Sequence, residues 1–333
     1  MGTTEDSLDL ATLYLQIYFG GMIFNMLYNF GAAILRAVGE TKKPLYFLGI
    51  AGLANVGLNF LLVLVFHLDV AGVAIGTIVS QAISCIMIVL SLMRRKGIVH
   101  LDLKKLKVDR KCLGEMILIG LPAGIQGSLF SVSNVFIQSA VNSFKTSVVV
   151  AGNTAAANLE GFVYAGMNSF YQACITFTSQ NYGAGKIKNC KKALLYSQLC
   201  TIVSGVLFGG LVLLFGRPLL GIYTPNPEAI DIGMIRLEII CTTYFLCGIM
   251  DVMVGGLRGL GYSIVPMIVS ILGACVFRLI WIYTIFQVEH TLFILYISYP
   301  ISWLVTGLVH LICYLVVYRK VKRKLMYLNL ITD

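Results

Sequence analysis

Long runs of apolar residues separated by short polar stretches make up most of this chain. A helix needs about 20 apolar residues to cross the hydrocarbon core of a bilayer, which is about 30 Å thick. Nine segments reach that length with few charges or none. Because lipid offers no hydrogen-bond partners to an open backbone, each segment is predicted to be a helix. In chain order the segments are residues 10–35, 45–66, 70–93, 116–144, 146–185, 193–216, 229–256, 264–286 and 291–318.

The composition agrees with an all-α integral membrane protein. Hydrophobic residues make up 58% of the sequence and charged residues 12%, whereas soluble domains carry about 25% charged residues. The acidic opening of the chain lacks the basic start and the cleavage site of a secretory signal peptide. The 9 cysteines include no CxxC pair, so neither a disulfide framework nor a zinc site is expected.

Basic residues are concentrated on one side of the predicted helices. Of the 25 lysines and arginines, 21 fall in stretches assigned to that side, and cytoplasmic loops are the ones that carry such an excess. We therefore expect a cytoplasmic C-terminus, an N-terminus of this chain outside, and no nucleic-acid partner despite the net charge of +10. The basic stretches are residues 36–43, 94–111, 186–192, 258 and 319–324.

One short motif occurs twice. The stretches AILRAVGETKKPLY and GGLRGLGYSIVPMI share Leu-Arg, a glycine, a hydroxyl residue and a proline at the same spacing. Each glycine is expected to relieve crowding in a sharp turn, and each proline to begin the next helix. We assign these residues a structural role. The matched positions are Arg36 with Arg258, Gly39 with Gly261, and Pro44 with Pro266, each pair 222 residues apart.

The repeat predicts two lobes related by a parallel duplication, a pattern of secondary transporters. Two segments follow each motif copy, so the repeating unit has six helices and its parent protein twelve. By this count, three of the twelve helices are expected to be absent from this chain. The predicted domains are an incomplete N-lobe at 1–93, a basic cytoplasmic linker at 94–114, a complete C-lobe at 115–318 and a basic cytoplasmic tail at 319–333.

Polar side chains inside the predicted membrane helices are the candidates for chemistry. Such groups are costly in lipid and mark transport pathways by default, although hydrogen-bonded helix packing is the alternative. The segments 116–144 and 146–185 are richest in them. Glu160 has no basic residue within a helical turn, so it is expected either to exchange a proton or hold Na⁺, or to stay protonated against an amide. The candidate pathway residues are Gln126, Asn134, Gln138, Asn153, Glu160, Tyr164, Asn168, Asp251, Asn55 and Asn59.

Four charged residues of the last helices are open to more than one interpretation. Asp251 could be a coupling carboxylate, but we favour a position at the cytoplasmic interface. Arg236 and Glu238 lie near the outer end of their segment and are expected to be solvated. Arg278 lies in mid-helix and is expected to form a structural ion pair.

No motif of an enzyme or of a nucleotide-binding site stands in a suitable context. GxSxG, HExxH and P-loop patterns are missing from the places where their chemistry needs them. The 4 histidines are dispersed and predict no metal site. We therefore expect that the chain is not an enzyme, does not use ATP directly and binds no cofactor other than a coupling ion.

Four stretches give the chain a family resemblance: NFGAAILRAVGETKKPLYFLGIAGLANVGLNF, GLPAGIQGSLFSVSN, FTSQNYGAGK and GGLRGLGYSIVPMI. Together they resemble the bacterial branch of the multidrug and toxic compound extrusion (MATE) transporters. The resemblance implies twelve helices in two lobes, with the segments of this chain as helices four to twelve. It also implies antiport, driven by Na⁺ or H⁺, that exports small organic compounds, often cationic and aromatic, across the bacterial inner membrane by alternating access of the lobes. Membrane lipids are the other expected partner.

The chain departs from the family at one proposed ion site. Several members keep an Asn and an Asp one turn apart in the fifth helix; Asn55 matches the first, but Asn59 replaces the acid. Two amides without a carboxylate make a weak cation site, so we favour a packing role and take Glu160 as the best remaining coupling candidate. Two alternatives stay open: a lipid-linked sugar flippase of related fold, and a truncated membrane fragment that does not transport.

Overall fold

The computed structural model describes residues 5–97 and 99–327, with side chains from residue 8 onward. Every regular element in that part of the chain is helical, which confirms the predicted all-α class. The chain divides into two compact units, Met1–Val108 and Asp109–Asp333. The division falls inside the segment 94–114 that the sequence marks as a linker.

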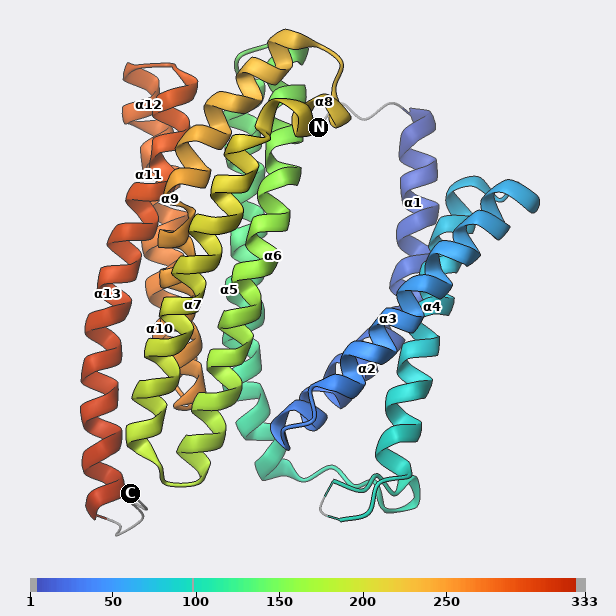
Figure 1. Cartoon of the computed structure of the whole chain (residues 1–333), viewed down its shortest axis with the longest axis vertical. Helices are drawn as coiled ribbons and strands as arrows, with labels where there is room; N and C mark the ends of the chain where they lie inside the picture. The colour runs from blue at the N-terminus through green and yellow to red at the C-terminus, as the bar shows by residue number, and fades with distance from the viewer. Residues whose placement is uncertain (1–4, 98, 328–333) are drawn as a thin grey trace. The chain divides into compact units, whose positions relative to one another are not determined.

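Unit 1 is a small group of helices around α4 (Figure 1). Helix α4 contacts α1, α2 and α3, and Leu35, Ile88 and Leu92 form its buried apolar centre. Helices α1 and α2 meet at a bend of 45°, next to a pair of glycines that disfavours a continuous helix. The elements are α1 (Glu5–Gly20), α2 (Met22–Ala37), α3 (Lys42–Phe60), a π-helical turn (Leu61–Val65), α4 (Asp69–Met93) and a 3₁₀ turn (Leu103–Lys105).

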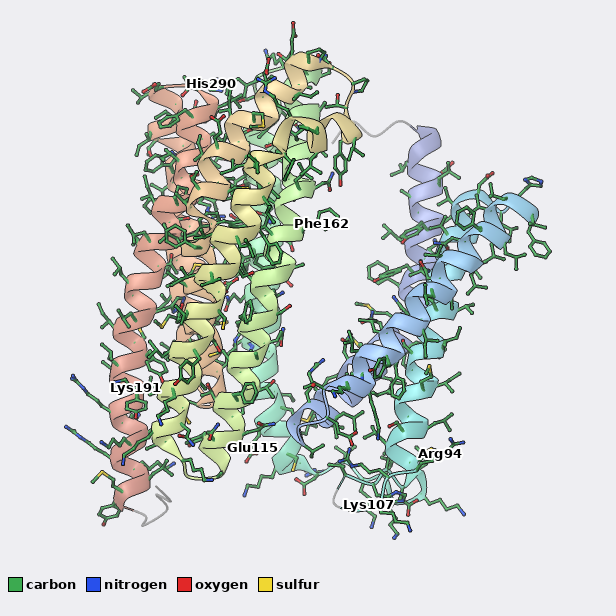
Figure 2. The ribbon with its side chains drawn as sticks, viewed as in Figure 1. Arg94, Lys107, Glu115, Phe162, Lys191 and His290 are labelled. Carbon is green, nitrogen blue, oxygen red and sulfur yellow. The ribbon has the colours of Figure 1, made fainter. Side chains whose placement is uncertain are left out.

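Unit 2 is a bundle of long helices with α9 at its centre (Figure 1). Helix α9 contacts α6, α7 and α13. The turn between α6 and α7 and the C-terminal end of α13 share one end of the unit, with Lys191 near the start of α7, and His290 lies at the other end (Figure 2). The elements are α5 (Arg110–Asn142), α6 (Ser147–Gly183), α7 (Ile187–Leu214), α8 (Gly216–Tyr223), α9 (Pro227–Gly259), α10 (Ile264–Ser270), a π-helical turn (Ile271–Val276), α11 (Phe277–Tyr283), α12 (Ile285–Val288) and α13 (Leu292–Tyr327).

The start of α5 follows from the residue before it. The Asp109 side chain accepts hydrogen bonds from the backbone N–H groups of Cys112 and Lys111, each at 2.9 Å. This is the preferred cap of a helix N-terminus, because the first N–H groups have no partner inside the helix. The same two bonds favour the charged carboxylate and lower the pKa of Asp109.

The number of membrane spans differs from the nine predicted. Within the described residues, seven helices are long and apolar enough to cross a membrane, and the bent α1–α2 pair makes an eighth if it is one span. Helix α6 forms over 37 residues but is not among the seven. Its polar residues, which include Asn153, Glu160 and Asn168, lower its apolar character. The chain is therefore a multi-pass membrane protein, and the count of nine is not confirmed.

The two motif copies share one backbone conformation. Gly39 has φ +85° and Gly261 has φ +86°, values in the left-handed region where glycine carries no steric penalty. Each glycine N–H donates to the carbonyl of the arginine three residues earlier, at 3.0 Å for Gly39 and 2.9 Å for Gly261. Pro44 and Pro266 are the third residues of α3 and α10, where a missing N–H costs little.

We expect Gly261→Ala to lower the free energy of unfolding by about 1–2 kcal/mol, because a side chain is strained in the left-handed region. The matched control is Gly210→Ala in α7, where an added methyl meets nothing within 4 Å; helix propensity predicts a stability equal to or above wild type there. Unfolding of the detergent-solubilised protein measures both variants. Equal stabilities would contradict the assignment of a strained turn.

Candidate functional site

A cavity of about 610 Å³ lies within unit 2. Its walls come from α5, α6, α9, α11 and α13, so it is formed by residues of this unit alone. Eight of the ten candidate pathway residues line it: Gln126, Asn134, Gln138, Asn153, Glu160, Tyr164, Asn168 and Asp251.

Helix α6 supplies much of the polar wall because its polar residues repeat on one face. Glu160 and Asn153 are seven residues apart, Tyr164 follows Glu160 by four, and these spacings share a helix face. Phe162 lies on another face: it is 71% exposed and points away from the bundle (Figure 2). One side of α6 thus lines the cavity while the other is suited to lipid.

The centre of the polar wall is an ion pair between α6 and α9. Arg236 Nε and Nη2 donate to the two carboxylate oxygens of Glu160, each at 2.7 Å, and both side chains are 7% exposed. Arg236 Nη1 donates to Asn153 Oδ1 at 2.7 Å, and the Tyr296 hydroxyl donates to the same oxygen at 3.1 Å. Two-pronged charge-assisted bonds of this kind are strong and fix geometry.

This ion pair corrects two sequence interpretations. Glu160 is not a carboxylate without a basic neighbour, because Arg236 of another helix reaches it. Arg236 is not solvated, since it is buried at 6% exposure. Residues within one helical turn of Glu160 do not include Arg236, because the two members of the pair are 76 residues apart in the sequence.

Arg278 also differs from its expected role. No ion pair of Arg278 with a carboxylate is found within the described residues. Instead its Nε donates to Ser302 Oγ at 2.9 Å, and its guanidinium lies over the rings of Tyr299 and Trp303, at 4.2 and 5.6 Å from their centres. Its Nη2 is buried without a hydrogen-bond partner in that part of the structure. The faces of these two rings thus stabilise the Arg278 charge, where the sequence predicts an ion pair.

Asp251 and Arg258 occupy the cavity wall contributed by α9. They are seven residues apart and so share a face of the helix. Asp251 interacts with the Tyr164 hydroxyl, which places it on the cavity wall rather than simply at an interface. Arg258 Nη2 donates to Gln126 Oε1 at 2.9 Å, and its Nη1 donates to the Tyr171 hydroxyl.

Arg258 shows what the sequence interpretation missed. The repeated motif predicts a structural role for it, and it lies in the last turn of α9, but it also lines the cavity. Its position seven residues after Asp251 was the available signal. Tyr171 and Gln172 of α6 line the cavity as well, and they continue the polar face that begins at Asn153.

The two remaining candidates lie elsewhere. Asn55 and Asn59 belong to α3 of unit 1, and Asn59 Nδ2 donates to Asn55 Oδ1 at 3.2 Å. The Asn59 carboxamide packs against Gly76 of α4. These contacts are those of a hydrogen-bonded helix-packing pair. Among residues 5–97 and 99–327, no group of three His, Cys, Asp or Glu side chains is arranged to hold a metal ion.

The sequence model of the MatE family matches residues 1–61 and 122–284, well over half of the chain. The chain belongs to the MatE family. The probable multidrug resistance protein YpnP of Bacillus subtilis is 28% identical over 276 residues, which cover 83% of this chain and 61% of YpnP. The probable multidrug resistance protein NorM of Thermotoga maritima is 25% identical, with 81% of this chain and 58% of NorM covered.

A solved MATE structure in complex with MaL6 has the same fold. It superposes with a TM-score of 0.89 at 19% identity, over 97% of this MatE chain and 73% of that chain. The MatE chain spans about three fifths of the length of the two curated relatives, so it is shorter than they are. The expectation that it is not an enzyme agrees with the names of the two curated relatives, which are probable multidrug resistance proteins.

Proposed function

We propose that this MatE chain belongs to a secondary transporter that exports small organic compounds, with the cavity of unit 2 as part of the substrate and ion pathway. The observation that carries the proposal is the cavity itself, because it gathers eight polar candidates, two of them carboxylates, inside an otherwise apolar bundle. Its volume lies within the range of about 300–1,000 Å³ typical of small-molecule sites.

Of the two carboxylates, Asp251 is the better coupling group. Both Glu160 oxygens are already engaged by Arg236, and releasing that carboxylate would leave a buried guanidinium unpaired. Asp251 interacts with the Tyr164 hydroxyl and with the charge of Arg258, and it lines the cavity. Because these interactions are not a two-pronged ion pair, Asp251 is the carboxylate that exchanges a proton or Na⁺ while the cavity alternates between the two sides of the membrane.

The basic ends of the helices support the expected orientation. Lys191 and the basic residues of α13 lie at one end of unit 2 (Figures 1 and 2), and lysine and arginine accumulate on the cytoplasmic side of bacterial membrane proteins. We propose that this end faces the cytoplasm. The repeat further supports an incomplete N-lobe at 1–93 joined by the linker at 94–114 to a C-lobe at 115–318.

Transport by the Asp251→Asn variant tests the proposal. The 333-residue chain is reconstituted in liposomes, and efflux of ethidium and of a naphthalene sulfonate is followed under an imposed proton or Na⁺ gradient. We expect gradient-driven efflux to fall to the level of empty liposomes in Asp251→Asn. Glu238→Gln is the matched control, because Glu238 is an exposed carboxylate of the same helix, and it should retain wild-type efflux.

Two results would count against this proposal. Wild-type efflux equal to empty liposomes, for both compounds and both gradients, would favour the non-transporting fragment. Full coupled efflux by Asp251→Asn would remove this carboxylate from the coupling mechanism.

A further inference from the structure

The charges lining the cavity of unit 2 are unequal. Three arginines, Arg236, Arg258 and Arg278, face two carboxylates, Glu160 and Asp251. The cavity wall therefore carries one formal positive charge in excess. In a low-dielectric interior such an excess favours an occupant of opposite charge.

The excess is located at Arg258 and Arg278. Glu160 neutralises Arg236 through both oxygens, which leaves a single carboxylate, Asp251, for the other two arginines. Arg278 is 3% exposed and is held by a serine hydroxyl and by ring faces. None of these groups supplies a full negative charge.

Two nitrogen atoms of these arginines are unsatisfied. Arg278 Nη2 and Arg258 Nε are buried and have no hydrogen-bond partner in the described part of the chain. A buried donor without an acceptor is costly, and more so when it is charged. Both side chains line the cavity, so an acceptor bound there would relieve the cost.

The rest of the wall is suited to an aromatic body. Phe130, Tyr244, Tyr299 and Trp303 line the same cavity, and rings of this kind bury large apolar area and stack on flat ligands. Tyr299 and Trp303 lie against the Arg278 guanidinium, which places apolar surface next to one of the unsatisfied donors.

We propose that this cavity binds a monovalent organic anion, an aromatic carboxylate or sulfonate, whose charged group balances the excess charge of Arg278 and Arg258. One excess positive charge matches one negative charge. A diphosphate would bring more negative charge than the wall balances, and an organic cation would add to the excess. This anion proposal specifies the substrate class for the export function proposed above, and it rests on that function.

Binding to the purified full chain in detergent tests the charge preference. Isothermal titration compares 4-benzoylbenzoate with three probes: (4-benzoylbenzyl)trimethylammonium, neutral benzophenone and geranyl diphosphate. We expect the carboxylate to bind at least about tenfold more tightly than any of the other three, the factor that a charge-assisted hydrogen bond supplies. Equal or tighter binding of the cation, the neutral compound or the diphosphate would overturn the proposal, and so would a lack of carboxylate binding.

Arginine variants locate the anion. In Arg278→Gln and in Arg258→Gln we expect the affinity for 4-benzoylbenzoate to fall about tenfold while the affinity for benzophenone changes little. Arg278→Lys, which keeps the charge, should recover part of the loss. Arg217→Gln is the control, because Arg217 is an exposed arginine of α8, 68% accessible and paired with Asp231.

Each variant is first checked by its thermal unfolding in detergent. If Arg278→Gln does not fold, Arg258→Gln carries the test alone. Wild-type carboxylate affinity in every folded variant of these two arginines would overturn the assignment. If the chain binds the anion selectively but does not transport, only the export function is contradicted. If it transports but prefers the cation, only the anion assignment is contradicted.

Discussion

Glu160→Gln is expected to lower the free energy of unfolding by about 3 kcal/mol or more, the largest loss that we predict for a single substitution in this chain. Removing one member of a buried ion pair leaves the other as an uncompensated charge, and such changes cost about 3–5 kcal/mol. Arg236 is buried at 6% exposure, so loss of the carboxylate leaves its charge with little solvation. Unfolding of the detergent-solubilised protein by SDS titration measures the effect.

Two further variants test whether this loss of stability comes from the broken ion pair. Glu238→Gln removes an exposed carboxylate of α9, and we expect a change within about 0.5 kcal/mol. The double variant Glu160→Leu with Arg236→Met replaces the pair by apolar side chains and is expected to regain most of the lost stability. A stability of Glu160→Gln equal to that of Glu238→Gln would show that the pair does not hold α6 to α9.

Gly152→Ala is expected to destabilise the protein by about 1–3 kcal/mol, the range found for overpacked sites. A methyl group on Gly152 of α6 would collide with the backbone carbonyl of Ala229 in α9. Because the obstacle is backbone rather than a flexible side chain, the two helices would have to separate. Close approach through small residues is a general device of helix packing in membranes.

The control for this variant lies on the same helix. A methyl group on Gly161 meets nothing within 4 Å, and replacing a helical glycine by alanine stabilises a helix by up to about 1 kcal/mol. Thermal unfolding of Gly152→Ala and Gly161→Ala in the same detergent compares them. Unchanged or increased stability of Gly152→Ala would contradict the close contact between α6 and α9.

The helices of unit 2 were largely predictable because their limits depend on local chemistry. The apolar run 229–256 corresponds to α9, Pro227–Gly259, which begins after the capping residue Asn226. In unit 1 the apolar run 10–35 predicts one helix, but the pair Gly20–Gly21 lies within it and the structure bends there by 45°. The count of spans was less predictable, because a polar pathway makes a long helix such as α6 less apolar.

The site was predictable only within single helices. Periodicity placed Asn153, Glu160 and Tyr164 on one face of α6, and all three line the cavity. Periodicity carries no information about which residue of a distant helix lies opposite. Arg236 therefore looked solvated, although the register of α9 against α6 brings it to Glu160.

Photolabelling tests most directly whether the small-molecule site of this chain lies inside unit 2. Tritiated 4-benzoylbenzoate and its trimethylammonium counterpart are crosslinked to the purified chain, with and without excess unlabelled compound, and the labelled residues are identified by mass spectrometry. We expect the label that is removed by competition to fall on wall residues of the cavity, such as Phe130 of α5 and Met250 of α9. Competed label confined to exposed apolar residues such as Phe162 would contradict it.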